Sequence, residues 1–332
     1  MVTLKDIAEE AGCSIMTVSR VINHVASKVS DETRQRIWDI IEARGYIPNS
    51  HAQSLSSRAS KLVAVLVSGE GNVFRSPYNA IMVGNITNAV QKRGYSVLLC
   101  TDVADYQVIT RQLTSWKVAG AIFLGLFDSD LNRIREDNQI PLVFTDSYST
   151  VRQLTNVGID DYRGGELGAR FLLENGHREI VFAGHSTDDS PVLRERLRGF
   201  TNILKESGIQ LPRERVLPDY PTREQIEAVL ISPKPTAFFA VSDFIALSII
   251  SVLNDLGINV PGDISVIGFD NIEMGQFSNP KLTTIAQDIN KKAQIAVDLL
   301  FEHIENPAAP AQNVVLDVQL VIRDSVAARK SL

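Results

Sequence analysis

The hydrophobic positions near the start of the chain repeat every three or four residues. Over residues 4–11 they follow the i, i+3, i+4, i+7 spacing of an amphipathic helix, and Gly12 can end that helix in the left-handed conformation. A second helix is predicted after the N-cap Ser14, and a third over about residues 31–44. Two short helices joined by a tight turn and followed by a third predict an all-α helix-turn-helix domain over residues 1–48.

From residue 61 the pattern changes to short apolar runs that alternate with amphipathic helices. The first run, Leu62–Val67, is apolar at every position, as expected for a strand that is buried on both faces. This alternation predicts parallel, doubly wound α/β sheets, and the length of the region suits two lobes. The predicted strands are 62–67, 96–100, 121–124, 141–144, 180–183, 236–241 and 265–268, and the predicted helices include 80–93, 164–174, 194–206, 243–256 and 290–305.

One face of the predicted second helix exposes two large apolar side chains. With Val18 and Val21 facing inward, Ile15, Met16 and Arg20 share the outer face. Apolar side chains at an exposed helix N-terminus are unfavourable unless they meet a partner, and base edges in the major groove of DNA, including thymine methyl groups, are suitable. The alternative is a three-helix bundle with no role in DNA binding.

Residues 49–60 are polar and rich in serine. Ala52 and Leu55 have the i, i+3 spacing of a helix of at most two turns, which is marginal in water and would form only when docked. A flexible linker is the alternative interpretation of this segment.

Composition limits the possible classes of protein but does not identify one. The 332 residues, 44% of them hydrophobic, exceed one typical core and indicate two or three domains. The short apolar runs predict no membrane segment, and the start of the chain lacks the pattern of a secretory signal, so we expect a cytoplasmic protein. The net charge of −6 gives no basic signal for nucleic acid, so a DNA-binding role must depend on the geometry of the helices.

The sequence carries no recognisable motif for catalysis, a cofactor or a metal. Gly69 and Gly71 follow the first predicted strand, but Phe74 stands where a dinucleotide-binding motif needs its third glycine. The five histidines are scattered, and Cys13 and Cys100 lack the spacing of metal ligands. The sequence therefore favours a binding protein over an enzyme.

Several short stretches together resemble the LacI/GalR family of transcriptional regulators. The N-terminal stretches are Asp6-Ile7-Ala8, Ala11-Gly12, Thr17-Val18-Ser19-Arg20-Val21 and Arg44-Gly45-Tyr46-Ile47-Pro48-Asn49. The later stretches include Val157-Gly158-Ile159-Asp160-Asp161, Arg194-Glu195-Arg196-Leu197-Arg198-Gly199-Phe200 and Asp263-Ile264-Ser265-Val266-Ile267-Gly268-Phe269-Asp270. The resemblance covers nearly the whole chain.

The resemblance implies a helix-turn-helix headpiece, a hinge over residues 49–60 and a two-lobed sensor over residues 61–326 that is similar to the periplasmic sugar-binding proteins. In that fold the chain crosses between the lobes three times, here near residues 157, 287 and 317. The expected lobes are about 61–157 with 288–316, and about 158–287 with 317–326.

For DNA recognition, the resemblance implies that Ile15, Met16 and Arg20 read bases. It also implies that Leu55, with Ala52, wedges into the minor groove at the centre of the site. The residues expected near phosphates are Thr3, Ser14, Thr17, Ser19 and Asn23. Because one headpiece covers half a site, a homodimer on a near-palindromic operator is expected.

For the sensor, the resemblance implies a repressor whose operator affinity is controlled by a sugar or sugar-derived effector between the lobes. A polyhydroxylated ligand needs planar charged groups that form paired hydrogen bonds, and an aromatic face for its ring. The expected contacts are Arg196 and Asp270 first, then Asp146, Asp160 and Gln287, with Phe74, Ser76, Tyr78 and Ser242 around them.

Alternatives to these effector contacts stay open at this point. Asp160 is also suited to cap the following helix, and Asp146 could be a solvated carboxylate. Ser242 stands where many relatives have asparagine, which leaves room for a bulkier effector or a water. An acidic or phosphorylated sugar also stays possible as the effector, because three arginines lie near possible cleft loops: Arg75, Arg152 and Arg194. A regulator of the same fold that is controlled mainly by a protein co-regulator is the alternative function.

Overall fold

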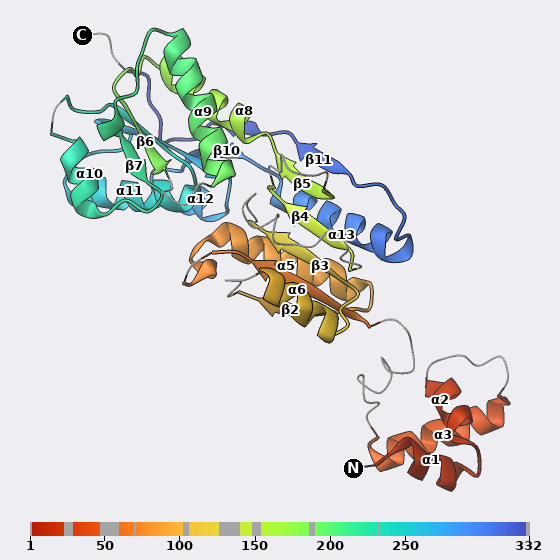
Figure 1. Ribbon diagram of the computed structural model, residues 1–332. Helices are drawn as coiled ribbons and strands as arrows, with labels where there is room; N and C mark the ends of the chain where they lie inside the picture. Colours follow the sequence, from red (N-terminus) through yellow and green to blue (C-terminus); the bar gives the residue numbers. More distant parts are fainter. Residues whose placement is uncertain are drawn as a thin grey trace. The chain divides into compact units, whose positions relative to one another are not determined.

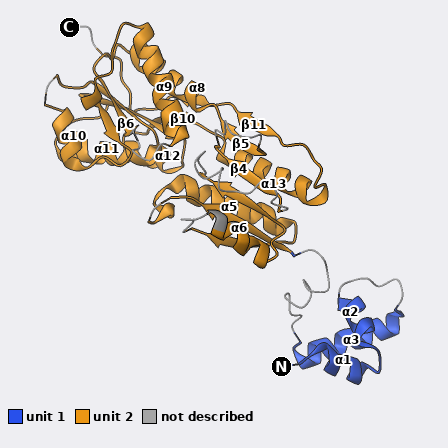
Figure 2. Cartoon of the chain, viewed as in Figure 1, with its two compact units in different colours: residues 1–60 blue, residues 61–332 orange. Residues whose placement is uncertain are grey.

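The computed structural model describes residues 2–22, 29–46, 60–69, 71–101, 106–125, 140–147, 154–185, 190–231 and 233–329. The chain divides into two compact units, Met1–Ser60 and Lys61–Leu332 (Figure 2). Asn23, Ala52 and Leu55, which were expected to contact DNA, lie outside the described residues, as does the expected hinge except for Ser60.

The smaller unit contains three helices, α1 (Leu4–Ala11), α2 (Ile15–Ile22) and α3 (Asp31–Arg44). Gly12 and Gly45 follow α1 and α3 in the left-handed conformation, with φ of 64° and 58°. The side chains that pack between the helices are Ile7, Ala8, Ala11, Val18, Val21, Ile22, Ile37 and Ile41. The hydrophobic positions that repeat along these helices are therefore the buried ones. One face of α2 lies outside the core.

The first sheet of the larger unit contains six parallel strands in the order β11-β5-β4-β3-β1-β2 (Figure 1). The strands are β1 (Leu62–Val67), β2 (Ser96–Cys100), β3 (Gly120–Leu124), β4 (Leu142–Thr145), β5 (Asn156–Ile159) and β11 (Asn313–Leu316). The helices of this lobe are η1 (Val73–Arg75), α5 (Pro77–Lys92), α6 (Tyr106–Ser115) and α13 (Ile289–Glu305). Since β11 and α13 come from the C-terminal part of the sequence, this lobe is assembled from distant segments.

Both faces of the first sheet are covered, which explains why β1 is apolar at every position. Val63 and Val65 belong to the cluster that includes the buried side chains of α5 and α13. Ala64 and Leu66, which alternate with them, pack in a second cluster with Ile109 of α6. Successive strand residues point to opposite faces, so a doubly wound sheet requires a continuous apolar run.

The second sheet has the strand order β12-β10-β9-β8-β6-β7, and all its pairs are parallel except β10 with β12. The strands are β6 (Ile180–His185), β7 (Val216–Pro218), β8 (Ala237–Ala240), β9 (Ser265–Asp270), β10 (Thr283–Ala286) and β12 (Gln319–Val321). The helices are α8 (Asp161–Glu174), α9 (Pro191–Glu206), η2 (Arg213–Arg215), α10 (Arg223–Val229), α11 (Asp243–Asp255) and α12 (Met274–Phe277).

Neighbouring residues of β9 show that helices lie on both faces of the second sheet. A Cβ on Gly164 of α8 would contact the Phe269 ring, whereas a Cβ on Gly268 would contact Asp243 at the start of α11. Three connections join the two sheets: β5 to α8 after Ile159, β10 to α13 at Gln287, and β11 to β12 at Asp317. The first sheet thus extends to Ile159, slightly past the boundary expected near residue 157.

The predicted strands and helices of the larger unit are all present, with ends that differ by a few residues. The sequence pattern did not identify β5, β7, β10, β11 and β12, nor α6, α10 and α12. Most of these elements are only three to seven residues long, so they contain too few residues to display a period.

Candidate functional site

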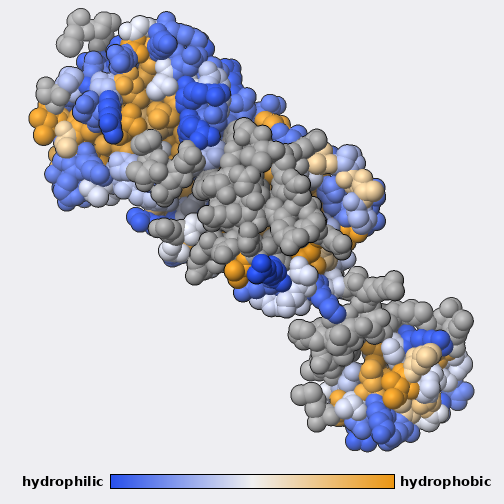
Figure 3. Space-filling model, in the orientation of Figure 1, coloured by the Kyte–Doolittle hydropathy of each residue, from blue (hydrophilic) through white to orange (hydrophobic). Residues whose placement is uncertain are grey.

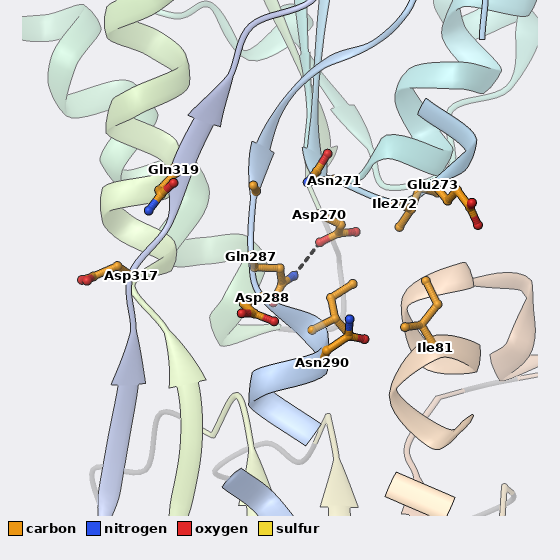
Figure 4. A pocket seen from close by; sticks show the side chains of 12 residues that line it. Ile81, Asp270, Asn271, Ile272, Glu273, Gln287, Asp288, Asn290, Asp317 and Gln319 are labelled. Atoms are coloured by element: carbon orange, nitrogen blue, oxygen red, sulfur yellow. Dashed lines mark hydrogen bonds between the residues drawn. The ribbon is translucent and has the colours of Figure 1, made fainter. Parts of the chain in front are cut away.

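A chain of hydrogen bonds joins the two lobes of the larger unit. Asp270 is the last residue of β9 and is 6% exposed, and its Oδ1 accepts a hydrogen bond of 2.6 Å from Gln287 Nε2 (Figure 4). Gln287 lies in the second crossing, and its Oε1 accepts a hydrogen bond of 2.7 Å from Lys292 Nζ. Because Lys292 belongs to α13 of the first lobe, this chain connects the carboxyl end of β9 with the other lobe.

Lys292 is fully buried, and it continues the chain to two of the expected effector residues. Its Nζ donates to Asp146 Oδ1 at 2.7 Å and to Tyr78 Oη at 3.1 Å. Tyr78 Oη in turn donates to Asp146 Oδ2 at 2.7 Å. Asp146 directly follows β4, and Tyr78 lies in the first turn of α5. The alternative of a solvated Asp146 is wrong, because both of its carboxylate oxygens accept hydrogen bonds from protein groups.

The protonation states in this cluster follow from burial. Burial raises the pKa of Asp270 to about 6, although the nearby Arg196 charge and the hydrogen bond from Gln287 act in the opposite direction. Burial, and then the charge of Asp146, hold the pKa of Tyr78 well above its ordinary value. Tyr78 therefore keeps its proton and acts as the donor in its hydrogen bond with Asp146.

Arg196 presents a fixed, planar cation on the second lobe. Its Nε donates to Asp161 Oδ1 at 2.7 Å, and its Nη1 donates to the carbonyl oxygen of Val241 at 2.5 Å. The guanidinium carbon lies 3.6 Å from the centroid of the Phe269 ring, within the range of a cation–π contact. Arg196 is 6% exposed, so these contacts are made away from bulk water. The side chain is held in one orientation before any ligand arrives.

The backbone is unusual where the strands reach this cluster. Asp146, Asp270 and Asn271 have positive φ angles of 55°, 110° and 58°. Residues with a Cβ adopt such angles uncommonly, and asparagine and aspartate tolerate them best. Strained residues of this kind concentrate at functional sites, which supports a binding role at the carboxyl ends of β4 and β9.

A cavity of about 580 Å³ lies where the second and third crossings meet the end of β9 (Figure 4). Ile81 of α5 closes it from the first lobe, and Asp270 and Gln287 take part in its wall. The other lining residues are Asn271, Ile272, Glu273, Ala286, Asp288, Ile289, Asn290, Asp317 and Gln319. The lining formed by the described residues contains carboxylates and amides but neither lysine nor arginine, so the cavity is suited to hydrogen-bond donors.

Several other expected effector residues have local structural roles. Asp160 Oδ1 accepts a hydrogen bond of 2.8 Å from the Arg163 backbone and caps α8, and Ser242 Oγ accepts one of 3.2 Å from Ile245 and caps α11. Phe74 lies in η1 with part of its side chain exposed, and Ser76 precedes α5. Contact of these four residues with an effector stays a prediction.

Sequence reasoning did not identify the buried charged residues Lys292, Asp161 and Asp243, which lie around the candidate site. Asp243 Oδ1 accepts a hydrogen bond of 2.5 Å from Thr284 Oγ1, and burial raises its pKa to about 8. Asp161 and Asp243 each follow a strand closely, which is a detectable signal. Lys292 lies within a helix next to another lysine, and nothing in that local pattern indicates burial.

The exposed face of α2 is the candidate DNA-binding surface. Ile15 is 48% exposed and Met16 is 62% exposed, and Figure 3 shows hydrophobic surface on this unit. Ser14 Oγ accepts a hydrogen bond of 3.1 Å from the Thr17 backbone and caps the helix, and Ser19 and Arg20 are half-buried. An exposed helix N-terminus that carries apolar side chains and no acidic residue is compatible with a major groove.

The acidic residues of α1 are largely compensated within the unit. Glu10 Oε2 lies 2.6 Å from Arg44 Nη2 of α3, and Lys5 Nζ lies 3.8 Å from Glu9 Oε1. Thr3 Oγ1 donates to Asp6 Oδ2 at 2.8 Å and accepts from the Asp6 backbone, as the N-cap of α1. The Thr3 hydroxyl is therefore engaged in the cap, and a phosphate contact of Thr3 stays a prediction.

In the described part of the chain, none of the helices is long and apolar enough to cross a membrane. The described residues also contain no group of three or more histidine, cysteine, aspartate or glutamate side chains arranged to hold a metal ion.

Two family descriptions match the sequence: "Bacterial regulatory proteins, lacI family" over residues 3–49 and "Periplasmic binding protein-like domain" over residues 169–326. The chain is 31% identical over 341 residues to the HTH-type transcriptional repressor PurR of Photorhabdus laumondii, a match that covers 98% of this chain and 97% of the relative.

Solved structures match over the same extent. The lac repressor dimer bound to operator and the anti-inducer ONPF is 30% identical, with a TM-score of 0.84 and coverage of 98% of this chain and 99% of that one. A complex of the transcriptional regulator CelR with cellobiose is 28% identical, with a TM-score of 0.72 and coverage of 98% and 100%. These matches confirm the expected headpiece and two-lobed domain, and the named relatives are regulators rather than enzymes.

Proposed function

Because the chain belongs to the lacI family of bacterial regulatory proteins and is a DNA-binding repressor with an effector-binding domain, we propose that its affinity for a near-palindromic operator is controlled by a sugar or sugar derivative bound between the two lobes. The repressor acts in the cytoplasm as a homodimer. The observation that carries this proposal is the buried chain of side chains from Asp270 through Gln287 and Lys292 to Asp146.

The headpiece supports the assignment of the base-reading residues. Ile15 and Met16 expose apolar surface at the start of α2, where a helix entering the major groove contacts base edges. Arg20 lies within the same helix, and a guanidinium can donate to guanine or phosphate. Ser14, Thr17 and Ser19 share this helix or its cap and are suited to phosphate contacts.

A homodimer follows from the geometry of recognition. One helix-turn-helix reads one half-site, and a two-fold dimer places two of them on a near-palindrome. The larger unit carries exposed hydrophobic side chains on and near α12, among them Met274 and Phe277, which are suited to burial against a second copy. The lac repressor structure that this chain resembles is a dimer bound to operator.

A hydroxyl-rich effector fits the polar groups between the lobes. Arg196 is a planar donor in a fixed orientation, and Asp270 is a buried acceptor at the carboxyl end of a parallel strand. Adjacent hydroxyl groups of a sugar bind well to such a pair, because each hydroxyl can donate to the carboxylate and accept from the guanidinium. The CelR relative is named as a complex with cellobiose, a ligand of this chemical class.

Control of DNA binding requires that the effector favour one arrangement of the lobes. A ligand on Asp270 competes for a group that is hydrogen bonded to Gln287, and Gln287 is bonded to Lys292 of the first lobe. The ligand therefore changes the contacts that join the lobes. A different lobe arrangement changes the separation of the two headpieces in the dimer and hence the operator affinity.

The test is a fluorescence-anisotropy titration of the full chain with operator candidates selected from genomic fragments, with and without a panel of saccharides. We expect tight binding to one near-palindromic duplex and a shift in its Kd with at least one saccharide. Asp270→Asn should bind the operator but lose the shift, whereas the exposed control Asp255→Asn on α11 should keep it. A wild-type Kd that no saccharide changes would contradict the proposed effector class.

A further inference from the structure

We infer that the buried Lys292–Asp146 ion pair makes the cleft selective for an uncharged polyhydroxylated effector over the corresponding sugar acid. This inference rests on the proposed function, because it concerns the effector of the same cleft. It differs from the expectation based on the sequence, in which several arginines were compatible with an acidic or phosphorylated sugar as the effector.

Both cations of the cluster already have a carboxylate partner. Lys292 Nζ lies 2.7 Å from Asp146 Oδ1, and both side chains are largely buried. Arg196 Nε lies 2.7 Å from Asp161 Oδ1, and these side chains are buried as well. A buried ion pair has little remaining attraction for a further anion, because the partner carboxylate compensates the positive charge at contact distance.

The hydrogen-bonding capacity of Lys292 is also used completely. An ammonium group has three N–H donors, and those of Lys292 are directed to Asp146, to Tyr78 and to Gln287. A ligand carboxylate could bind Lys292 only by displacing one of these acceptors. Lys292 therefore does not provide an anion site, although it lies among the candidate effector residues.

Among the described residues, the charge that remains around the cleft is negative. In the described part of the chain, no lysine or arginine forms an ion pair with Asp270, which accepts a hydrogen bond from the neutral Gln287. Glu273, Asp288 and Asp317 add carboxylates to the wall of the adjacent cavity. An anionic ligand would be repelled by these groups and would lose its hydration, whereas hydroxyl groups can donate to them.

Of the arginines that suggested an acidic ligand, Arg75 adds little to this balance. Arg75 lies 4.6 Å from the Tyr220 ring centroid, and its side chain is exposed, so water and salt screen its charge. Arg194 has an interaction partner, and Arg152 lies outside the described residues.

The charge of the pair can be changed with little disturbance of shape. Asp146→Asn keeps the size of the side chain and suits the left-handed backbone at this position, but it leaves Lys292 without a compensating charge. In the double variant Asp146→Asn/Lys292→Met both charges are absent. Asp298→Asn is the control, because it removes the carboxylate of the Arg93–Asp298 pair, which joins α13 to the C-terminal end of α5 at the surface.

The experiment measures ligand binding to the full-length chain by isothermal titration calorimetry, with circular dichroism to verify folding. The probes are glucose and glucuronate, galactose and galacturonate, and ribose and ribonate. For the wild type and Asp298→Asn we expect a neutral probe to bind at least tenfold more tightly than its acid. Asp146→Asn should shift the ratio of the two affinities towards the acid by about tenfold or more, and the double variant should reverse that shift.

The possible results either support or overturn the inferred preference for a neutral effector. Wild-type binding of an acid as tight as that of its neutral partner overturns the inference and leaves the proposed function intact. An acid preference that persists in the double variant also overturns it, because the shift would not then depend on the charge of Lys292. If no probe binds the wild type, both the inference and the proposed effector class fail.

Discussion

Gly165 of α8 lies directly against the backbone of Arg196 in α9. A Cβ on Gly165 would lie 2.0 Å from the Arg196 carbonyl oxygen, and a Cβ on Gly199 of α9 would lie 2.0 Å from the Tyr162 carbonyl oxygen. The two helices therefore touch through their backbones. This approach brings the Arg196 guanidinium to Asp161 at the start of α8. The orientation of a candidate effector residue thus depends on two glycines in the helix pair that carries it.

We expect Gly165→Ala to destabilise the larger unit by about 3 kcal/mol, at the upper end of the range for overpacking, because a backbone atom cannot move as a side chain can. Effector binding should weaken as well, since the α8–α9 separation positions Arg196. Thermal unfolding and calorimetry measure the two effects. Gly84→Ala on α5 is the control, because a Cβ there meets nothing within 4 Å and alanine favours helix. Equal stability of the two variants would contradict the expected role of the close approach.

Asp243 makes the stability of the larger unit depend on pH. Burial, followed by the charge of Asp270, raises its folded-state pKa from 3.8 to about 8. Between these values the folded chain binds more protons than the unfolded chain, so stability falls as pH rises and becomes constant above about 8. The slope approaches about 1.4 kcal/mol per pH unit for one proton.

Asp243→Asn should remove this slope, because the amide has no titrating proton and can still accept the hydrogen bond from the Ile272 backbone. The comparison is made between pH 6.5 and 8, above the pKa of about 6 for Asp270, so that the protonation of Asp270 contributes less to the slope. Melting temperatures of the wild type should fall over this interval and those of the variant should stay level. Parallel pH profiles for the two proteins would show that Asp243 is ionised throughout.

The sequence was informative wherever burial repeats with a regular period. The strand Leu62–Val67 and the helix caps Gly12 and Ser14 could be located because a continuous apolar run and capping are local properties. Short strands such as β10 and β12 gave no comparable signal. Their pairing joins residues far apart in the chain, and three or four residues cannot display a period.

The candidate site was only partly predictable for a related reason. Arg196, Asp270 and Gln287 were found through resemblance, and Tyr78 and Asp146 were expected near them. Lys292 was not found, because a lysine on a helix is ordinarily solvated and its burial depends on partners in other segments. Local sequence shows which charged residues are present, whereas the partner that compensates each charge is known only from the folded chain.

The exposed side chains of α2 give a prediction for DNA recognition. We expect Ile15→Ala/Met16→Ala to fold normally, because both side chains lie outside the core, and to lose operator affinity by about tenfold to a hundredfold. Affinity for random duplex should change little, since it depends on phosphate contacts. Anisotropy titrations at one salt concentration measure both. Gln35→Ala on the exposed face of α3 is the control. An equal loss on both duplexes would argue against base reading by these residues.

Arg196 offers a test of whether its planar geometry, and not only its charge, serves the effector. Arg196→Lys keeps the charge but cannot donate to Asp161 and Val241 from one rigid group while lying over the Phe269 ring. We expect effector affinity to fall by at least tenfold, with operator binding in the absence of effector retained. Arg215→Lys provides a matched comparison.

Arg215 is likewise buried in the second lobe and bonded to a carboxylate and a backbone carbonyl, those of Glu179 and Pro233, but it lies away from the effector candidates. Both substitutions should lower the melting temperature, because each replaces a satisfied guanidinium by a single ammonium group. Calorimetry should separate them, since under the proposed function effector affinity depends on Arg196 and not on the cation beside Glu179. If Arg215→Lys weakens effector binding as much as Arg196→Lys does, general destabilisation explains both, and Arg196 has no direct part in recognition.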